Sequence, residues 1–116
     1  MAAAVITLNE SGAAIGHVTG KIVMNTSAIA AQKVSIGFVP SRVELFNYTN
    51  VSQHNWQKGM GNGYVEQQVT AGDKTIVTTN GISEWAGDDN EGPGFIIGTD
   101  AEMTGTSEVA YFIAFR

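Results

Sequence analysis

The chain has 116 residues, a formal net charge of −5 and a hydrophobic fraction of 43%. This length fits one domain, and this composition excludes an intrinsically disordered protein. There is no cysteine, which excludes disulfides, thiolate metal sites and cysteine nucleophiles. No segment approaches the ~20 consecutive apolar residues of a membrane-spanning helix. Residues 1–10 lack the basic region of a signal peptide, so we expect neither a signal peptide nor a membrane-spanning helix.

The charges are unevenly distributed along the chain. Between Lys74 and Arg116 there are acidic residues but no Lys or Arg. We interpret this acidic half as a solubilising surface, and docking to a basic partner surface is the alternative. Because the chain has no basic stripe that could displace counterions from phosphates, we expect no nucleic-acid binding.

The first third of the chain predicts strands separated by one ambiguous segment. Residues 5–8 are typical of a short strand or of an extended N-terminal arm. Residues 17–24 alternate in polarity, which predicts a strand with Val18, Ile22 and Met24 facing inward. Residues 25–32 fit either a helical turn or a loop that crosses the end of the sheet.

Residues 33–49 form the segment around which we expect the fold to be organised. Val34, Ile36 and Phe38 alternate with small or polar residues, and a second run follows Pro40. Proline removes a hydrogen-bond donor and fixes φ, so it ends or bends a strand. The pattern predicts two strands joined at a proline corner, passing through the middle of a β-sandwich.

The second half of the chain contains further strand signals. Residues 64–69 and 74–79 predict strands, and Asn80-Gly81 is the strongest hairpin signal in the chain. An acidic, glycine-rich loop follows, and residues 94–98 predict a short buried strand. Residues 109–115 are apolar on both faces, which is typical of a central strand or of an edge strand covered by another subunit.

These patterns predict an all-β fold. We expect one β-sandwich domain over residues 1–116, jelly-roll-like, with about eight short antiparallel strands. A flattened barrel would give nearly the same sequence pattern, and the strand order is not determined by the sequence.

Motifs for catalysis and cofactor binding are incomplete. His17 and His54 lack the spacing of metal ligands, and no G-x-S-x-G elbow anchors a serine nucleophile. The segment from Lys58 to Gly63 is rich in glycine, but its spacing fits no phosphate-binding loop, so we interpret it as a turn. The sequence therefore predicts no catalytic residue and no cofactor, and a small β-sandwich hydrolase is the least favoured function.

The acidic loop contains a partial calcium motif. Residues 88–92 resemble the start of a calcium-binding loop, but Pro93 stands where the motif requires glycine. We predict no metal site, and a looser calcium site that includes Asp100 remains the alternative.

Three aromatic residues lie in or beside the turn-rich segments. Trp56, Tyr64 and Trp85 could stack on sugar rings, as aromatic residues do in carbohydrate-binding modules. The alternative is that they plug the ends of the sandwich or fill an interface between subunits.

A set of structural motifs resembles small virion structural proteins of tailed bacteriophages, and capsid decoration (cement) proteins in particular. The residues that carry this resemblance cover about half of the positions after residue 35: Ile36-Gly-Phe-Val-Pro40, Val43, Asn47, Trp56, Gly59-Met60, Gly94-Phe95, Ile97-Gly98, Asp100 and Tyr111-Phe-Ile-Ala-Phe-Arg116. The resemblance implies a β-rich, non-enzymatic subunit, often a homotrimer, that binds the major capsid protein on the outer surface of the virion. Such a protein would be made in the host cytoplasm and would not bind a membrane.

We expect the N-terminal arm, residues 1–8, to help attach this protein, because an apolar arm can add a strand to a neighbouring subunit. The predicted interface residues are Val5, Ile6, Leu8, Trp56, Tyr64 and Trp85. The main alternative function is a tail, baseplate or fibre module that binds host glycans through Trp56, Tyr64 and Trp85.

Overall fold

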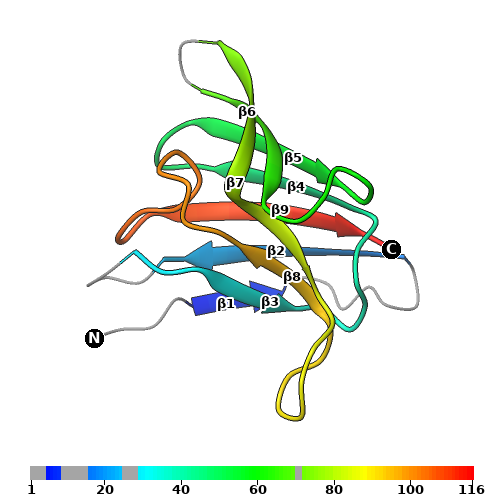
Figure 1. Ribbon diagram of the computed structural model, residues 1–116. Helices are drawn as coiled ribbons and strands as arrows, with labels where there is room; N and C mark the ends of the chain where they lie inside the picture. Colours follow the sequence, from blue (N-terminus) through cyan, green and yellow to red (C-terminus); the bar gives the residue numbers. More distant parts are fainter. Residues whose placement is uncertain (1–4, 9–15, 25–28, 70–71) are drawn as a thin grey trace.

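The computed structural model describes residues 5–8, 16–24, 29–69 and 72–116 (Figure 1). These residues form nine β-strands and no helix, and therefore contain no helical membrane span. The strands are β1 (Val5–Leu8), β2 (His17–Val23), β3 (Gln32–Ser35), β4 (Arg42–Asn47), β5 (Ser52–Gln57), β6 (Tyr64–Gln68), β7 (Lys74–Trp85), β8 (Gly94–Ile97) and β9 (Val109–Phe115).

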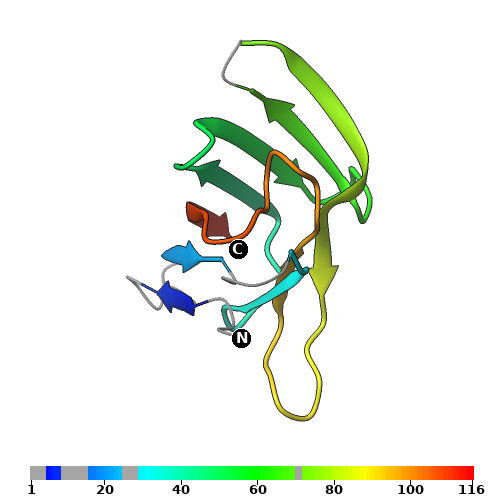
Figure 2. The same ribbon diagram turned by 90° about the vertical axis from the view of Figure 1, so that its left-hand side faces the viewer.

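All nine strands belong to one antiparallel sheet in the order β1-β2-β9-β4-β5-β6-β7-β8-β3. The sheet curls on itself, so that its two end strands, β1 and β3, lie at the same end of the molecule (Figures 1 and 2). The expected all-β, antiparallel fold is confirmed. The two-layer shape comes from one nearly closed sheet, and the jelly-roll likeness is limited to this shape, because β4 to β8 follow one another as a meander.

Strand β7 belongs to both layers of the sheet. Its first half pairs with β6, and its second half pairs with β8, from Ile82 opposite Ile97 to Trp85 opposite Gly94. Between the halves the register with β6 shifts, and Asn80 adopts a positive φ of 63°. The larger layer therefore contains β1, β2, β9, β4, β5, β6 and the first half of β7, and the smaller layer contains the second half of β7, β8 and β3 (Figure 2).

The corner in β7 requires close backbone contacts. The Gly81 N–H donates to the Gly63 carbonyl at 3.0 Å, and the Gly81 carbonyl accepts from the Gly98 N–H at 2.8 Å. A Cβ on Gly81 would lie 2.7 Å from the Gly63 carbonyl oxygen, and a Cβ on Gly98 would collide with the backbone of Asn80. Glycine is therefore needed where the backbones of β6, β7 and the segment after β8 meet.

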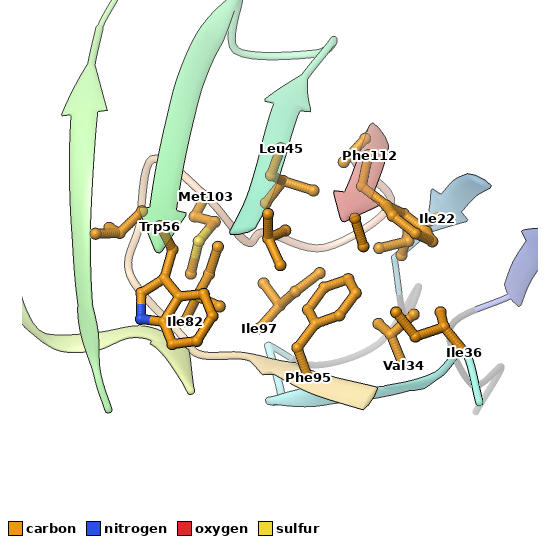
Figure 3. Close-up of a cluster of buried hydrophobic side chains, with 14 of the residues drawn as sticks. Ile22, Val34, Ile36, Leu45, Trp56, Ile82, Phe95, Ile97, Met103 and Phe112 are labelled. Atoms are coloured by element: carbon orange, nitrogen blue, oxygen red, sulfur yellow. The ribbon is translucent and has the colours of Figure 1, made fainter. Parts of the chain in front are cut away.

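The hydrophobic core fills the space between the two layers (Figure 3). The larger layer contributes Ile22, Leu45 and Phe112, and the smaller layer contributes Phe95 and Ile97, among other buried residues. The rings of Phe95 and Phe112 meet edge to face across the layers with centroids 5.3 Å apart. Aromatic pairs in this geometry add to the stability that burial alone supplies.

Two predictions about strand positions were wrong. The strand expected at residues 33–39 ends at Ser35, because Gly37 adopts a φ of 94° and its N–H, like that of Ile36, donates to the Pro93 carbonyl. This strand is also an end strand of the sheet and not a central one. The inward positions of Val34, Ile36 and Phe38 were predicted correctly.

The predicted hairpin at Asn80-Gly81 does not exist. This pair produces the bend within β7, where a positive φ serves a change of layer instead of a reversal of the chain. The segment predicted as a helical turn or loop at residues 25–32 lies partly outside the described residues, and its last residue, Gln32, begins β3.

We expect Gly81→Ala to lower the free energy of unfolding by about 1–3 kcal/mol, because the new methyl group would overlap backbone atoms of Gly63 and Tyr64. Gly92→Ala is the matched control, since a Cβ at Gly92 meets nothing within 4 Å. Urea denaturation of both variants measures the change. Equal midpoints for the two variants would show that the close contact at the corner is not needed.

Candidate functional site

The outer face of the larger layer contains an exposed group of aromatic side chains. On β9, Ala110, Phe112 and Ala114 point into the core, so Tyr111 and its alternate neighbours point outward. On β4, Phe46 also points outward, and its Cα lies directly opposite that of Tyr111. Of the two alternatives for residues 109–115, the central strand is the correct one, since β9 lies between β2 and β4. Its outer apolar face is open to solvent.

We call Phe46, Tyr48 and Tyr111 the aromatic patch. Their exposed fractions are 38%, 63% and 41%. The ring centroids of Phe46 and Tyr48 are 6.3 Å apart, and those of Tyr48 and Tyr111 are 6.1 Å apart. Both pairs have edge-to-face geometry. Strand backbones on β4 and β9 fix two of the three rings, so a partner that covers the patch would order few side chains.

Shallow hollows lie along the outer face, and one of them adjoins the aromatic patch. One hollow of about 240 Å³ is lined by residues of β4, β5 and β9, including Phe46, Gln53 and Tyr111. The other, of about 210 Å³, is lined by residues that include Arg42, Asn55 and Glu66.

Polar side chains continue this outer face across β4, β5 and β6. Glu44 lies opposite Asn55, and Asn55 lies opposite Glu66, so the three form one row across the strands. Arg42 forms an ion pair with Glu44 at 3.1 Å. The Oδ1 atom of Asn55 is buried and has no hydrogen-bond partner among the described residues. The surface therefore combines exposed aromatic rings with amide and carboxylate groups that can form hydrogen bonds.

A second group of polar side chains lies inside the fold, where the loop after β8 covers one end of the core. Ser52 and His54 are 1% and 0% exposed, and Ser52 Oγ lies 2.9 Å from His54 Nε2. The Ser52 hydroxyl donates to the Glu102 carbonyl at 2.8 Å. Gln67 is also buried, and its amide donates to Asp100.

The hydrogen-bond pattern assigns the tautomer of His54. Because the single hydroxyl hydrogen of Ser52 is directed to Glu102, Nε2 carries the ring hydrogen and donates to Ser52 Oγ. Nδ1 is then an acceptor, buried without a partner among the described residues. In this tautomer Nε2 cannot accept the Ser52 proton, so the pair is a structural contact and not a nucleophile with its base.

Burial lowers the pKa of His54 to about 4. The negative charge of Asp100 and the nearby backbone of Glu102 raise the pKa, but they offset the burial only in part. The ring is therefore neutral at pH 7.

The loop after β8 is attached to the β4–β5 hairpin by side-chain amides. The Asn47 amide donates to the Met103 carbonyl at 3.0 Å and to Glu108 Oε1 at 2.9 Å. The Asn50 amide donates to the same Glu108 oxygen at 3.1 Å and to the Glu102 carbonyl at 3.2 Å. These contacts hold the loop as a fixed cover over the core.

The predicted interface residues of the N-terminal arm lie in the protein's own sheet. Val5, Ile6 and Leu8 belong to β1, which pairs with β2 from Val5 opposite Val23 to Leu8 opposite Gly20. Ile6 packs against the hydrophobic core. The arm therefore adds a strand to its own subunit in this structure, and its first four residues lie outside the described part.

The three predicted aromatic interface residues have different environments. Trp56 is 1% exposed and its indole N–H donates to the Gly61 carbonyl, so its prediction as an interface residue was wrong. Trp85 is half-buried, with the Lys33 ammonium 4.4 Å from its ring centroid. Tyr64 is exposed at the start of β6. The three do not form one sugar-binding platform, because a core residue cannot stack on a ligand.

The calcium motif has a simpler local role. Asp88 Oδ1 accepts the backbone N–H groups of Asn90 and Glu91, and these bonds lower the pKa of Asp88. Asp100, the other candidate ligand, accepts from Gln67 and from the Glu102 N–H. Within the described residues, no group of three or more His, Asp or Glu side chains is placed to hold a metal ion.

The sequence contained a signal for the aromatic patch that was not used. Phe46 and Tyr48 alternate with core residues of β4, and Tyr111 alternates with core residues of β9, so their outward direction follows from the strand period. The pairing of β4 with β9, which brings them together, is a contact between distant segments that no local pattern encodes.

Comparison with known proteins gives no relative: no family model, no curated protein and no solved structure matches this chain.

We expect the stability of the protein to fall by roughly 3 kcal/mol between pH 7 and pH 4 through His54 alone, since each unit of pKa difference corresponds to about 1.4 kcal/mol. Unfolded chains take up a proton near the ordinary pKa of 6.5, whereas folded His54 does so only near 4. Stability is therefore fully present above pH 6.5 and is lost as the pH falls through this window.

Urea denaturation at several pH values measures this effect. The His54→Gln variant should show a flatter dependence on pH from 6.5 to 4, whatever its stability at pH 7. If the variant and the wild type lose the same free energy over this range, the histidine is not buried in its neutral form.

Proposed function

We propose that this protein is a virion structural protein of a tailed bacteriophage, specifically a homo-oligomeric capsid decoration protein that binds the outer capsid surface and stabilises the shell. The observation that carries the proposal is the aromatic patch on the outer face of β4 and β9. The resemblance in sequence motifs supports the same class of protein.

The aromatic patch has the properties of a binding surface for another protein. Its rings are large, exposed and held against one another in edge-to-face pairs. Aromatic residues are enriched among those that dominate binding energy at protein interfaces. Covering apolar area stabilises a contact by about 25 cal/mol per Å², and repeated contacts across a lattice of capsid subunits would multiply the effect.

A decoration protein must also keep its shape while it joins capsid subunits. The curled sheet satisfies this requirement because the outer face lies on central strands, backed by the core residues Val43, Leu45 and Phe112. A rigid face loses little conformational entropy on binding, so more of the contact energy appears as affinity.

A second candidate function is a tail, baseplate or fibre module that binds host glycans. It is supported by the hollow that Phe46 and Tyr111 line, by the second hollow farther along β4 and β5, and by the unpartnered Oδ1 of Asn55, which lines the second hollow. A hydroxyl group of one sugar unit could donate to this oxygen while another unit of the same extended glycan stacks on Tyr48 or Tyr111. This candidate uses the outer face and not Trp56.

We expect the double variant Tyr48→Ser, Tyr111→Ser to bind undecorated capsids at least tenfold more weakly than the wild type, because it removes two exposed rings at the proposed contact. A loss of about 1.4 kcal/mol in binding free energy corresponds to a factor of ten. Co-sedimentation with capsids over a concentration series measures the dissociation constant.

Tyr64→Ser is the control, since Tyr64 is also an exposed tyrosine but lies on β6, two strands away from β4. It should bind like the wild type. Unchanged binding by the double variant would contradict the proposal for this face. Saturable binding of a host glycan by the wild type, lost in the double variant, together with no capsid binding, would favour the second candidate.

A further inference from the structure

The first half of β7 is an exposed sheet edge. Residues Lys74 to Val77 pair with β6 on one side, and β8 begins its pairing with β7 only at Ile82. No strand among the described residues lies on the other side of residues 74–79. An edge of this kind presents unpaired N–H and C=O groups to any further strand.

The pairing with β6 shows which backbone groups of β7 point toward the open edge. The Val69 N–H donates to the Asp73 carbonyl, so these two residues form a hydrogen-bonded pair at the start of the ladder. In an antiparallel ladder such pairs alternate with non-bonded ones. The N–H and C=O groups of Thr75 and Val77 therefore face β6. The N–H and C=O groups of Lys74 and Ile76, and the N–H of Thr78, face the open edge.

Between Lys74 at its start and the bend at its end, the edge lacks the usual protection against strand pairing. Residues 75–79 contain no proline and no charge, and all five are β-branched: Thr75, Ile76, Val77, Thr78 and Thr79. Ile76 is 57% exposed. Natural edge strands are normally blunted by proline, inward charges or short length, so this segment is suited to pairing.

We propose that a second copy of this chain pairs with this edge, strand β7 against strand β7, in antiparallel orientation about a two-fold axis. A register centred on Ile76 aligns the backbone groups of Lys74, Ile76 and Thr78 that face the open edge with those of the second copy. Lys74 then lies opposite Thr78, so no like charges meet, and the two Ile76 side chains lie side by side on the outer face. The larger layers of the two copies form one continuous sheet.

A second copy fits this edge better than a foreign peptide does. Peptides that add a strand to a sheet obtain specificity from side-chain pockets beside the edge. Neither hollow on the outer face is lined by a residue of the 74–79 segment. The edge is instead complementary to itself, which is the property that a two-fold contact requires.

This contact deepens the homo-oligomer part of the proposed function and does not depend on capsid binding. It involves a different strand from the aromatic patch, so the failure of one leaves the other intact. A two-fold contact gives dimers, whereas a homotrimer requires a head-to-tail contact, and the mass in solution distinguishes them.

Ile76→Pro tests the contact, because it removes an N–H group that faces the open edge without removing a hydrogen bond to β6. Ile76→Thr is the matched control, since it keeps the N–H group and the β-branched shape. Analytical ultracentrifugation of the wild type over a concentration series, up to roughly 1 mM, measures association, which we expect in the range of weak contacts because the edge is short.

We expect the wild type and Ile76→Thr to form dimers, and Ile76→Pro to dissociate at least tenfold more readily. Circular dichroism and urea denaturation of each variant verify that the fold is retained. If Ile76→Pro unfolds, Thr78→Lys takes its place. This substitution keeps the backbone N–H and places a second positive charge opposite Lys74 of the other copy, so that the two charges repel. A wild type that stays monomeric at the highest concentration, an oligomer that is equally stable in all variants, or a trimer would overturn the proposal.

Discussion

The structure depends on the way in which β7 changes from one layer to the other. A single sheet encloses a core only if it does not stay flat, and here the sharpest bend within a strand occurs at Asn80 and Gly81 of β7. The absence of a side chain at Gly81 and Gly98 lets three backbones meet at this corner. Because β7 leaves β6 there, Phe95 and Ile97 of the smaller layer can face Leu45 and the other core residues of the larger layer (Figure 3).

The same corner explains which surfaces remain open. Residues 74–79 lie on the far side of the corner from β8, so one edge of the larger layer has no neighbour. The outer face of that layer is likewise uncovered, because the smaller layer packs only on the inner face (Figure 2). Both proposals therefore follow from one architectural fact: the sheet closes around its core and leaves a face and an edge for other molecules.

The interior at one end of the fold is polar, and the burial of these polar groups lowers the stability of the protein at acid pH. His54 and Gln67 occupy inward positions that hydrophobic residues hold elsewhere in the sheet. Asp100 of the loop after β8 accepts from Gln67, and Ser52 connects His54 to the Glu102 carbonyl of the same loop. A buried polar group is tolerated when it is hydrogen-bonded, yet one nitrogen of His54 is not. The polar interior thus fixes the loop in place and makes stability sensitive to acid.

Local alternation in the sequence was sufficient for much of the fold. It gave the all-β class and the inward direction of residues such as Val34 and Val18, because a half-buried strand has a period of two. It did not identify β5, since Ser52 and His54 stand at inward positions and disguise the pattern. Nor could it show that Trp56 lies in the core.

The candidate site could not be predicted from the sequence for a related reason. The aromatic patch exists because β9 returns from the end of the chain to lie beside β4, and Asn80-Gly81 bends a strand because β6 and β8 are both present to pair with it. Both outcomes are set by partners distant in sequence, so the same residues elsewhere would give an isolated tyrosine or an ordinary hairpin.

Residue-resolved amide hydrogen exchange of dilute, monomeric protein tests the central claim about β7 most directly. The structure predicts slow exchange at the N–H groups of Thr75 and Val77, which face β6, and fast exchange at those of Lys74, Ile76 and Thr78, which face the open edge. It also predicts slow exchange where residues 82–85 pair with β8. Uniform exchange along residues 74–78, or fast exchange throughout residues 82–85, would contradict a strand that is shared between the two layers.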